Sequence, residues 1–238
     1  MAYEVDIHIA FDTVSWKFLL LVLTRFGFHP SFVGWISTIL RSTMLSIRIN
    51  GKLVGFFPCS KGVRQGDPLF PLLFCLTEEV LSRGLSKFVN DKKILHMAGL
   101  HGFLTPSYVL YVDDIFVFCR ANNKSLRNLS TFLKTYGNFS GQYVNNSKSN
   151  FFTMDNSARF VTKIQCILSC RHGCLPFNYL RVSIFVGAPK SRFLQPLADK
   201  VKLKLASWKG KYVSMMGQIQ LVNTVITGIL VHSFNLYK

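Results

Sequence analysis

Residues 108–118 read YVLYVDDIFVF, two apolar runs with Asp113 and Asp114 between them. Tyr, Val, Ile and Phe favour strands and Asp favours turns, so this stretch predicts a β-hairpin. Adjacent carboxylates beside apolar strands repel one another and lose hydration unless a positive charge compensates them. A bound divalent cation is one compensator. A solvated turn capped by the two acids is the alternative.

The patterns on both sides of this hairpin mix strands and helices. Residues 45–49 and 53–57 flank Asn50-Gly51, a strong signal for a second hairpin. Further short strands are predicted at 3–9 and 151–152, and helices at 13–26, 31–40, 68–85 and 125–139. This order predicts an α+β domain, an antiparallel sheet with packed helices, followed by a smaller helical unit.

The charge balance indicates a polyanionic partner. The 238 residues contain 28 Lys and Arg against 11 Asp and Glu, a formal net charge of +17. A globular chain this basic usually faces nucleic acid or an anionic membrane, and a solvated basic surface is the alternative. The late lysines are candidates for phosphate contacts: Lys200, Lys202, Lys204, Lys209 and Lys211.

Neither end of the chain indicates a membrane protein. The start, MAYEVDIHIA, lacks the pattern of a secretory signal, so we expect an intracellular protein, nuclear or cytoplasmic. Residues 218–237 are the best candidate for a membrane span, but they carry too many polar groups. Their apolar positions follow a helical spacing, which favours a buried amphipathic helix and no membrane partner.

Several motifs together resemble the reverse transcriptase of plant LINE-type (non-LTR) retrotransposons. Residues 64–74, RQGDPLFPLLF, are similar to the second palm motif of these enzymes and are the most specific signal. YVDD at 111–114 resembles their Tyr-x-Asp-Asp box, and Asp6 with AFDTVSW at 10–16 resembles their first palm motif. Later blocks are similar at 140–149, at 175–180 (the primer-grip region), at 194–200 and at 206–209.

The resemblance implies a reverse-transcriptase palm over residues 1–160 and a primer-grip and thumb-like helical region over 161–238. Because Asp6 lies near the first residue, we expect the fingers to be missing and the chain to be truncated at its N-terminus.

The implied activity is RNA-directed DNA synthesis by a two-metal mechanism. The resemblance makes Asp6, Asp113 and Asp114 the catalytic residues and the metal ligands. Mg²⁺, as two ions, is the expected cofactor, with Mn²⁺ as an alternative. The expected partners are an RNA template, a DNA primer and deoxynucleoside triphosphates.

The resemblance also assigns nucleotide-binding residues. Phe11 would lie under the sugar and disfavour a ribose 2′-hydroxyl. Arg64, Gln65 and Gly66 would contact nucleotide and template, and Lys148 would neutralise or protonate the leaving phosphate. The alternatives are a core Phe11, a surface Arg64 and a solvated Lys148.

Some positions depart from the family pattern. Ile9 replaces a basic residue, Phe70 a Ser and Arg181 a Gly. With the fingers expected to be absent, these changes predict little or no polymerisation by this chain alone. The other hypotheses are a non-catalytic nucleic-acid-binding remnant and a maturase-like RNA-binding scaffold.

Overall fold

A computed structural model of the chain describes residues 1–63, 67–97, 106–111, 114–155, 157–179, 182–185, 187, 190–207 and 213–229. Its central element is a five-stranded sheet with the strand order β4-β5-β1-β6-β7. The strands are β1 (Ala2–Asp6), β4 (Tyr108–Tyr111), β5 (Asp114–Phe118), β6 (Asn150–Phe152) and β7 (Arg171–His172). All neighbouring pairs are antiparallel except β6 and β7.

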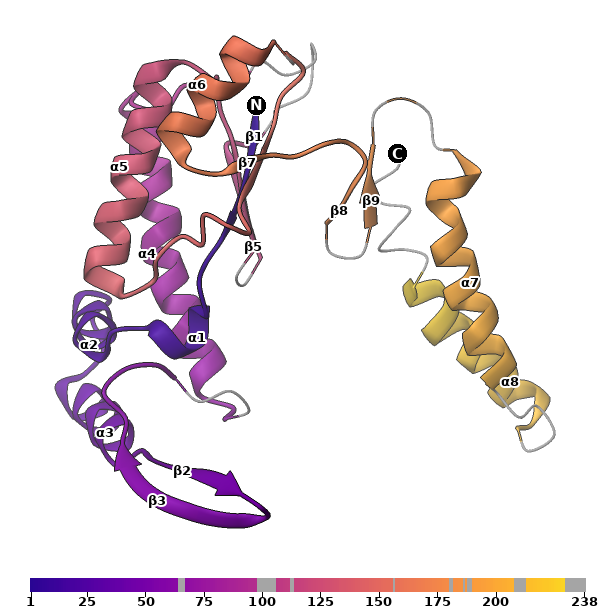
Figure 1. Cartoon of the computed structure of the whole chain (residues 1–238). Coiled ribbons are helices and arrows are strands. Elements are labelled where there is room, and N and C mark those ends of the chain that lie inside the picture. Colours follow the sequence, from indigo (N-terminus) through magenta and orange to yellow (C-terminus); the bar gives the residue numbers. More distant parts are fainter. Residues whose placement is uncertain are drawn as a thin grey trace. The chain divides into compact units, whose positions relative to one another are not determined.

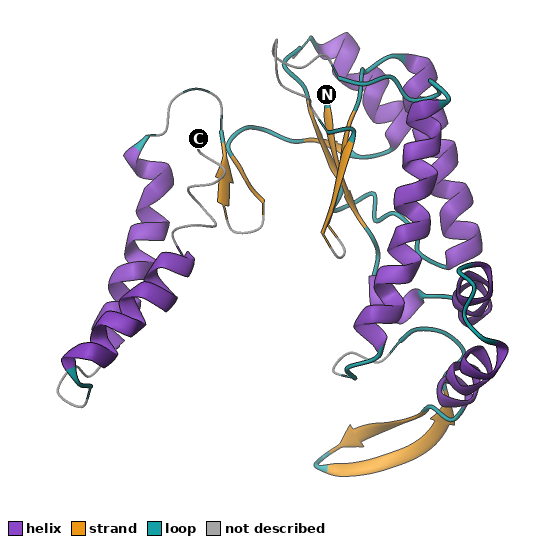
Figure 2. Cartoon of the chain, turned by 180° about the vertical axis from the view of Figure 1, so that it is seen from behind, coloured by secondary structure: helices purple, strands orange, loops and turns teal. Residues whose placement is uncertain are grey.

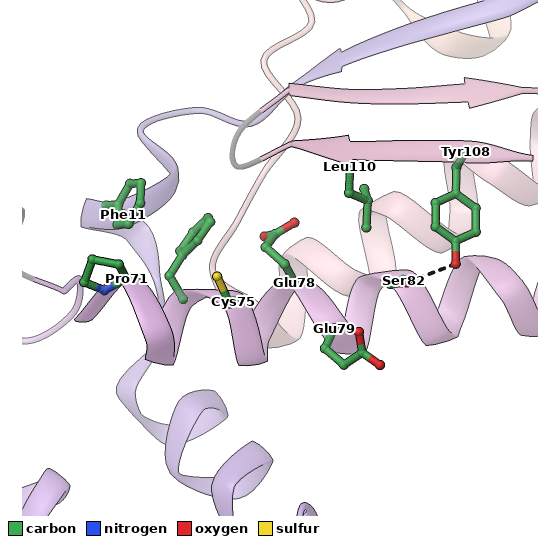
Figure 3. A pocket seen from close by; sticks show the side chains of 9 residues that line it. Phe11, Pro71, Cys75, Glu78, Glu79, Ser82, Tyr108 and Leu110 are labelled. Carbon is green, nitrogen blue, oxygen red and sulfur yellow. Dashed lines mark hydrogen bonds between the residues drawn. The ribbon is translucent and has the colours of Figure 1, made fainter. Parts of the chain in front are cut away.

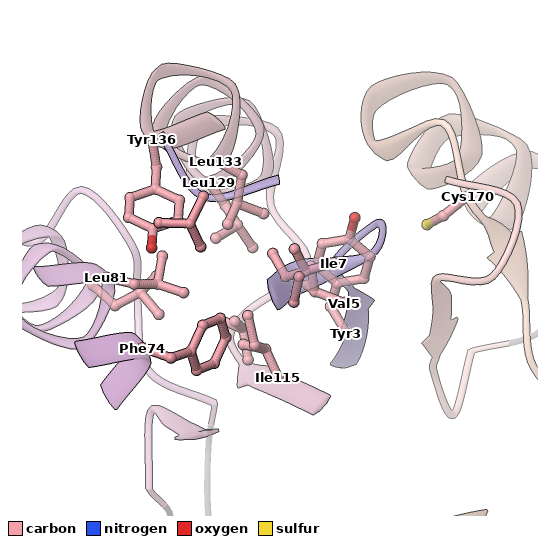
Figure 4. Packing of buried hydrophobic residues seen from close by; sticks show 14 of the residues in the cluster. Tyr3, Val5, Ile7, Phe74, Leu81, Ile115, Leu129, Leu133, Tyr136 and Cys170 are labelled. Carbon is pink, nitrogen blue, oxygen red and sulfur yellow. The ribbon is translucent and has the colours of Figure 1, made fainter. Parts of the chain in front are cut away.

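Helices α4 (Phe70–Asn90) and α5 (Asn123–Ser140) lie against one side of this sheet (Figures 1 and 2). Side chains alternate between the faces of a strand, so Tyr3, Val5 and Ile7 all point to the same side. All three are at most 3% exposed. Figure 4 shows Val5 and Ile7 among side chains of both helices, including Leu81 and Leu129. The opposite face of β1 carries Glu4 and Asp6, which are only partly buried.

The single helix predicted at 13–26 is in fact two helices, α1 (Ala10–Thr13) and α2 (Trp16–Arg25). Val14 between them is fully buried and has an extended ψ of 122°. Ser15 then caps α2 by accepting a hydrogen bond from the Phe18 N–H. Burial of Val14 and the serine cap therefore interrupt the helical pattern. Helix α3 (Pro30–Arg41) agrees with the prediction within a residue at each end.

The predicted second hairpin is present as β2 (Met44–Ile49) and β3 (Lys52–Pro58), which form a separate two-stranded sheet, here called the ribbon. Asn50 and Gly51 both have positive φ, 49° and 80°, as a two-residue hairpin turn requires. The ribbon projects away from α4 and α5 in both views (Figures 1 and 2). No residue of either strand is buried.

Helix α4, predicted over residues 68–85 with its end near Gly84, instead continues to Asn90. Gly84 serves helix packing, because a Cβ there would lie 2.6 Å from ring atoms of Phe132 on α5. The missing side chain lets the two helices approach, so this glycine does not end the helix.

Contacts divide the chain into two compact units, Met1–Gly173 and Cys174–Lys238. Helix α6 (Ala158–Leu168) belongs to the first unit. The expected division of the chain into a palm over residues 1–160 and a primer-grip and thumb-like region over 161–238 stays a prediction. The second unit has a short hairpin, β8 (Phe177–Tyr179) and β9 (Val182–Ile184). Its helices are α7 (Ser191–Ser207) and α8 (Met215–Leu221), the latter continued by a π-helical turn at Val222–Ile226. The α+β prediction for the fold is thus confirmed.

Of the late lysines, Lys200, Lys202 and Lys204 are exposed on α7, and Lys209 and Lys211 lie outside the described residues. Lys200 and Lys204 lie one turn apart on one side of the helix and Lys202 on the opposite side, so the three do not form a single basic face.

The predicted burial of the last helix holds only in part, since Leu221, Val225 and Ile229 are partly buried. Ile226 is buried, whereas Ile219 and Val222 are 47% and 43% exposed. Among the described helices, none combines the length and the apolar character needed to cross a membrane.

Candidate active site

Two of the three predicted catalytic carboxylates lie side by side. Asp6, the last residue of β1, is the direct antiparallel partner of Asp114, the first residue of β5. Directly opposite residues in an antiparallel pair point to the same face of the sheet, with Cβ atoms about 5 Å apart. More than a hundred residues separate them in sequence, so it is the β1–β5 register that brings these carboxylates together.

The backbone of Asp6 is held by the segment that contains Lys148. The Asp6 N–H donates to the Ser149 Oγ at 3.1 Å, and the Asp6 carbonyl accepts from the Asn145 N–H at 2.8 Å. Lys148 itself is exposed, and its N–H donates to the Asn145 carbonyl within the same turn. The turn therefore lies beside Asp6, while the role of the Lys148 side chain stays a prediction.

A third carboxylate, Glu4, belongs to the same region, and the sequence analysis missed it. Glu4 lies two residues before Asp6 on the same face of β1, and its Oε2 accepts a hydrogen bond from Asn150 Nδ2 at 2.9 Å. Burial raises the pKa of Glu4, the hydrogen bond from Asn150 opposes this, and the charges of Asp114 and Asp6 raise it further. The strand period of two, applied backward from Asp6, is the signal that would have found it.

The donor set suits a hard divalent cation. Mg²⁺ is typically bound by one or two carboxylates together with water and substrate phosphate oxygens. Asp6 and Asp114 supply such a pair. Within the described ranges, no three His, Cys, Asp or Glu side chains are close enough to hold a metal ion by themselves. Asp113, the third predicted ligand, lies outside those ranges.

Phe11 lines a cavity of about 410 Å³ between α1, α4 and β4 (Figure 3). Its ring stacks on Phe74 with a centroid distance of 4.2 Å and an interplanar angle of 22°. Figure 3 shows the Glu78 carboxylate pointing from α4 toward the β4–β5 hairpin, and Tyr108 bonded to Ser82 at the far end. Phe11 is thus a pocket residue held by stacking, and its role toward a sugar stays a prediction.

A buried polar network joins α4 to the segment that follows α5. Gln142, fully buried, donates from Nε2 to Glu78 Oε1 at 3.3 Å and accepts from the Tyr136 hydroxyl. Burial, and secondarily the Glu78 charge, raise the pKa of Tyr136, so this phenol remains neutral. The network fixes residues 140–142 against the helix that lines the pocket.

Two hydrogen bonds, one between backbone groups and one from a side chain, also hold the chain segments around Phe11 together. The Val63 N–H donates to the Phe11 carbonyl at 2.8 Å, and the Trp16 indole N–H donates to the Gly62 carbonyl at 2.6 Å. The chain then enters Arg64, Gln65 and Gly66, which lie outside the described residues. Their expected contacts with nucleotide and template therefore stay predictions.

Comparisons with known proteins give one family model and several retrotransposon proteins that match this chain. The model of the family "Reverse transcriptase (RNA-dependent DNA polymerase)" matches residues 1–184. The chain is 26% identical over 220 residues to the transposon TX1 uncharacterized 149 kDa protein of Xenopus laevis, covering 91% of this chain and 16% of that protein.

It is also 32% identical over 91 residues to a retrovirus-related Pol polyprotein from a type-1 retrotransposable element R2 of Popillia japonica, covering 38% and 14% of the two chains. Among solved structures, a telomerase of Candida tropicalis is similar over 62% of this chain and 29% of its own, with 15% identity and a TM-score of 0.46.

The chain spans about a sixth of the length of these curated relatives. The family match covers most of its residues, and the retrotransposon relatives share its sequence. The chain therefore belongs to the reverse transcriptase family, as a reverse transcriptase domain of the non-LTR retrotransposon type.

Proposed function

We propose that this chain is the palm part of an RNA-directed DNA polymerase whose chemistry takes place where β1 and β5 end. The observation that carries the proposal is the direct pairing of Asp6 with Asp114. Both lie on the face of the sheet opposite to the one on which Val5 packs toward α4 and α5. Paired carboxylates are suited to a polyanionic substrate only if a cation screens the acids.

Asp6 and Asp114, with Asp113, would hold that cation, Mg²⁺ or Mn²⁺. When bound, it supplies activation of the primer 3′-hydroxyl and stabilisation of the leaving pyrophosphate. The Ser149 and Asn145 contacts to the Asp6 backbone keep this carboxylate in register with Asp114. Phe11 would limit the space beside the nucleotide sugar, and Lys148 would meet the leaving phosphate.

The proposed partners are an RNA template, a DNA primer and deoxynucleoside triphosphates. The net charge of +17 and the exposed lysines of α7 support phosphate contacts. The motifs at 175–180 and 194–209 support a LINE element of the plant type. The small share of the relatives that the chain covers supports its being one part of a longer polymerase that supplies the remaining nucleotide contacts.

The first test separates metal binding from catalysis. Mn²⁺ binding is followed by electron paramagnetic resonance, which needs no polymerisation. We expect one or two bound ions in the parent and a loss of at least about tenfold in affinity in Asp6→Asn and Asp114→Asn. Asp91→Asn, an exposed acid at the end of α4, is the matched control and should bind as the parent does.

Primer extension on an RNA template with excess protein is the second arm. We expect weak extension, reduced by about 100-fold or more in Asp114→Asn and unchanged in Asp91→Asn. If the affinity for Mn²⁺ is the same in Asp6→Asn and Asp114→Asn as in the parent, these carboxylates do not form the proposed site.

The exposed cations of α7 favour a second candidate function, that of a nucleic-acid-binding protein without catalytic activity. Its binding to an RNA–DNA hybrid would fall steeply with salt, because each neutralised phosphate releases counterions. Salt-dependent hybrid binding together with no Mn²⁺ site would select this candidate over the polymerase.

A further inference from the structure

One buried amide is bonded to the wall of the cavity that Phe11 lines. Phe11 lies in the segment between β1 and α2, and its ring stacks on Phe74 of α4. About one helical turn further along α4, Glu78 lines the same cavity and accepts a hydrogen bond from Gln142 (Figure 3). Gln142 follows α5 and is fully buried. The cation site does not require this amide, so its burial needs another explanation.

Two backbone hydrogen bonds fix the ends of the segment that carries the stacked ring. At one end, the Ser15 N–H donates to the Ser140 carbonyl at 2.7 Å. At the other end, the His8 N–H donates to the Tyr143 carbonyl at 2.9 Å. The segment is therefore a loop, here called the gate loop, that is closed on the residues around Gln142.

The contacts link three parts of the domain in a cycle. The Phe11–Phe74 stack joins the gate loop to α4, and the Gln142 amide joins α4 to the segment after α5. The two backbone bonds join that segment back to the gate loop. In such a cycle each contact limits how far the other two can shift. The Gln142–Glu78 bond therefore helps to set where the Phe11 ring stands against α4.

The neighbours of Gln142 require an amide at this position. The Tyr136 hydroxyl donates to Gln142 Oε1, and Gln142 Nε2 donates to Glu78 Oε1 at 3.3 Å. Burial raises the pKa of Tyr136, so the phenol remains a donor, whereas an ionised carboxylate only accepts. Glutamine offers an acceptor to the first and a donor to the second. Methionine, of similar size, offers no donor, and an ionised glutamate would face Glu78 with a like charge.

We propose that Gln142 is a positioning residue for discrimination between nucleotide sugars. Through Glu78 it holds the Phe11 ring in the position from which the ring excludes a ribose 2′-hydroxyl. This inference rests on the sugar role proposed for Phe11 above. Gln142 itself is buried and acts only through the gate loop, so it is not a catalytic residue. Loss of its bond to Glu78 lets the loop shift, and a displacement of about 1 Å can change rates by about 100-fold.

The first measurement follows the gate loop and needs no polymerase activity. Amide hydrogen exchange at His8 and Ser15 reports the two backbone bonds that close the loop. At pH 8 we expect Gln142→Met and Gln142→Glu to speed exchange at both amides by about tenfold or more and to leave the amides of β5 unchanged. The double variant Glu78→Gln/Gln142→Glu again places a donor opposite a carboxylate. It should return both rates to within about threefold of the parent.

The chain offers a matched control for the change from glutamine to glutamate. Gln195 Nε2 donates to Asp199 Oδ1 at 2.9 Å on the exposed surface of α7. Gln195→Glu therefore also replaces an amide that faces a carboxylate, but in solvent and in the other unit of the chain. It should leave exchange at His8 and Ser15 unchanged.

The second measurement is the preference for a deoxynucleotide over a ribonucleotide in single-nucleotide addition to a primer, with Mn²⁺ and excess protein. We expect Gln142→Met to lower this ratio by about tenfold, and Glu78→Gln/Gln142→Glu to keep it near that of the parent. Phe11→Val should lower the ratio by itself. Gln142→Met added to Phe11→Val should lower it no further, since both changes act through the same ring. A general loss of folded protein would lower both rates and leave the ratio unchanged.

Three results would overturn the inference. One is unchanged exchange at His8 and Ser15 in Gln142→Met, or an equal acceleration in β5, which would make Gln142 an ordinary core residue. Another is exchange in Glu78→Gln/Gln142→Glu as fast as in Gln142→Glu alone. The third is faster exchange with an unchanged sugar preference. If the parent shows no preference for the deoxynucleotide, the sugar role proposed for Phe11 fails, and hydrogen exchange alone decides whether Gln142 holds the gate loop.

Discussion

The five-stranded sheet and the ribbon have similar strand compositions and opposite surroundings. In the sheet, Tyr3, Val5 and Ile115 are at most 2% exposed, because α4 and α5 cover one of its faces. In the ribbon no residue is buried, and the Asn50-Gly51 turn alone closes it. The stability of the sheet therefore resides in side-chain packing, and that of the ribbon in its turn geometry. Substitutions of the same type should have different effects in the two regions.

The largest difference is expected for a leucine truncation. Leu81 of α4 is fully buried beneath the sheet, so Leu81→Ala should lower the free energy of unfolding by about 2–5 kcal/mol. Leu53 of the ribbon is 65% exposed, and Leu53→Ala should change it by less than about 0.5 kcal/mol. Urea unfolding followed by circular dichroism measures both. Similar losses in the two variants would mean that the ribbon is packed as the sheet is.

Two glycines with positive φ refine the comparison. Gly141 follows α5 with φ +82°, and a Cβ there would lie 2.3 Å from the Thr13 carbonyl oxygen. Gly51 has φ +80° and no atom within 4 Å of such a Cβ. Gly51→Ala should cost about 1 kcal/mol for backbone strain alone. Gly141→Ala should cost at least about 1 kcal/mol more, because backbone must also move. If Gly141→Ala and Gly51→Ala lower the thermal midpoint of unfolding equally, the close approach of Thr13 to Gly141 adds nothing to the cost.

A smaller effect, in the stabilising direction, is expected at Ile9. Ile9 has φ 47°, a left-handed conformation that β-branched residues rarely adopt, and it is 53% exposed. Asn50 has φ 49° in the ribbon turn, a left-handed conformation that asparagine tolerates. Ile9→Asn should therefore raise the free energy of unfolding by about 1 kcal/mol, and Asn50→Ile should lower it by a similar amount. A destabilised Ile9→Asn variant would show that the exposed Ile9 side chain makes a contact worth more than the strain.

The same contrast explains what the sequence could and could not predict. The ribbon followed from Asn50-Gly51, because a two-residue turn is a local property. The pairing of Asp6 with Asp114 was expected from the shared need for a metal, and only the register gives its geometry. Gly84 misled the prediction of where α4 ends, because it serves contact with Phe132 on a distant helix. The break at Val14 depends partly on burial, which no local pattern reveals, and partly on the Ser15 cap, a local signal that the prediction of one helix overlooked.

The smallest expected effect concerns the acid that the sequence analysis missed. The pKa of Glu4 is raised in the folded chain, mainly by burial and further by the charges of Asp114 and Asp6. The folded state thus binds this proton more tightly than the unfolded state does. Its contribution to stability is fully present below the usual pKa of a glutamate and is lost as the pH rises through the raised value. At neutral pH the ionised Glu4 is therefore destabilising.

Glu4→Gln removes this charge and keeps an oxygen that accepts from Asn150 Nδ2. At pH 7, without divalent cations, it should stabilise the fold by less than about 1 kcal/mol, because Glu4 is only partly buried. Below about pH 4 the difference should vanish, since Glu4 is then protonated in both states. Mg²⁺ at neutral pH should reduce the difference by screening the three carboxylates. Arg48→Gln in the acid-free ribbon should show no such pH dependence. A Glu4→Gln variant less stable than the parent at pH 7 would mean that the Asn150 hydrogen bond outweighs the repulsion among the acids.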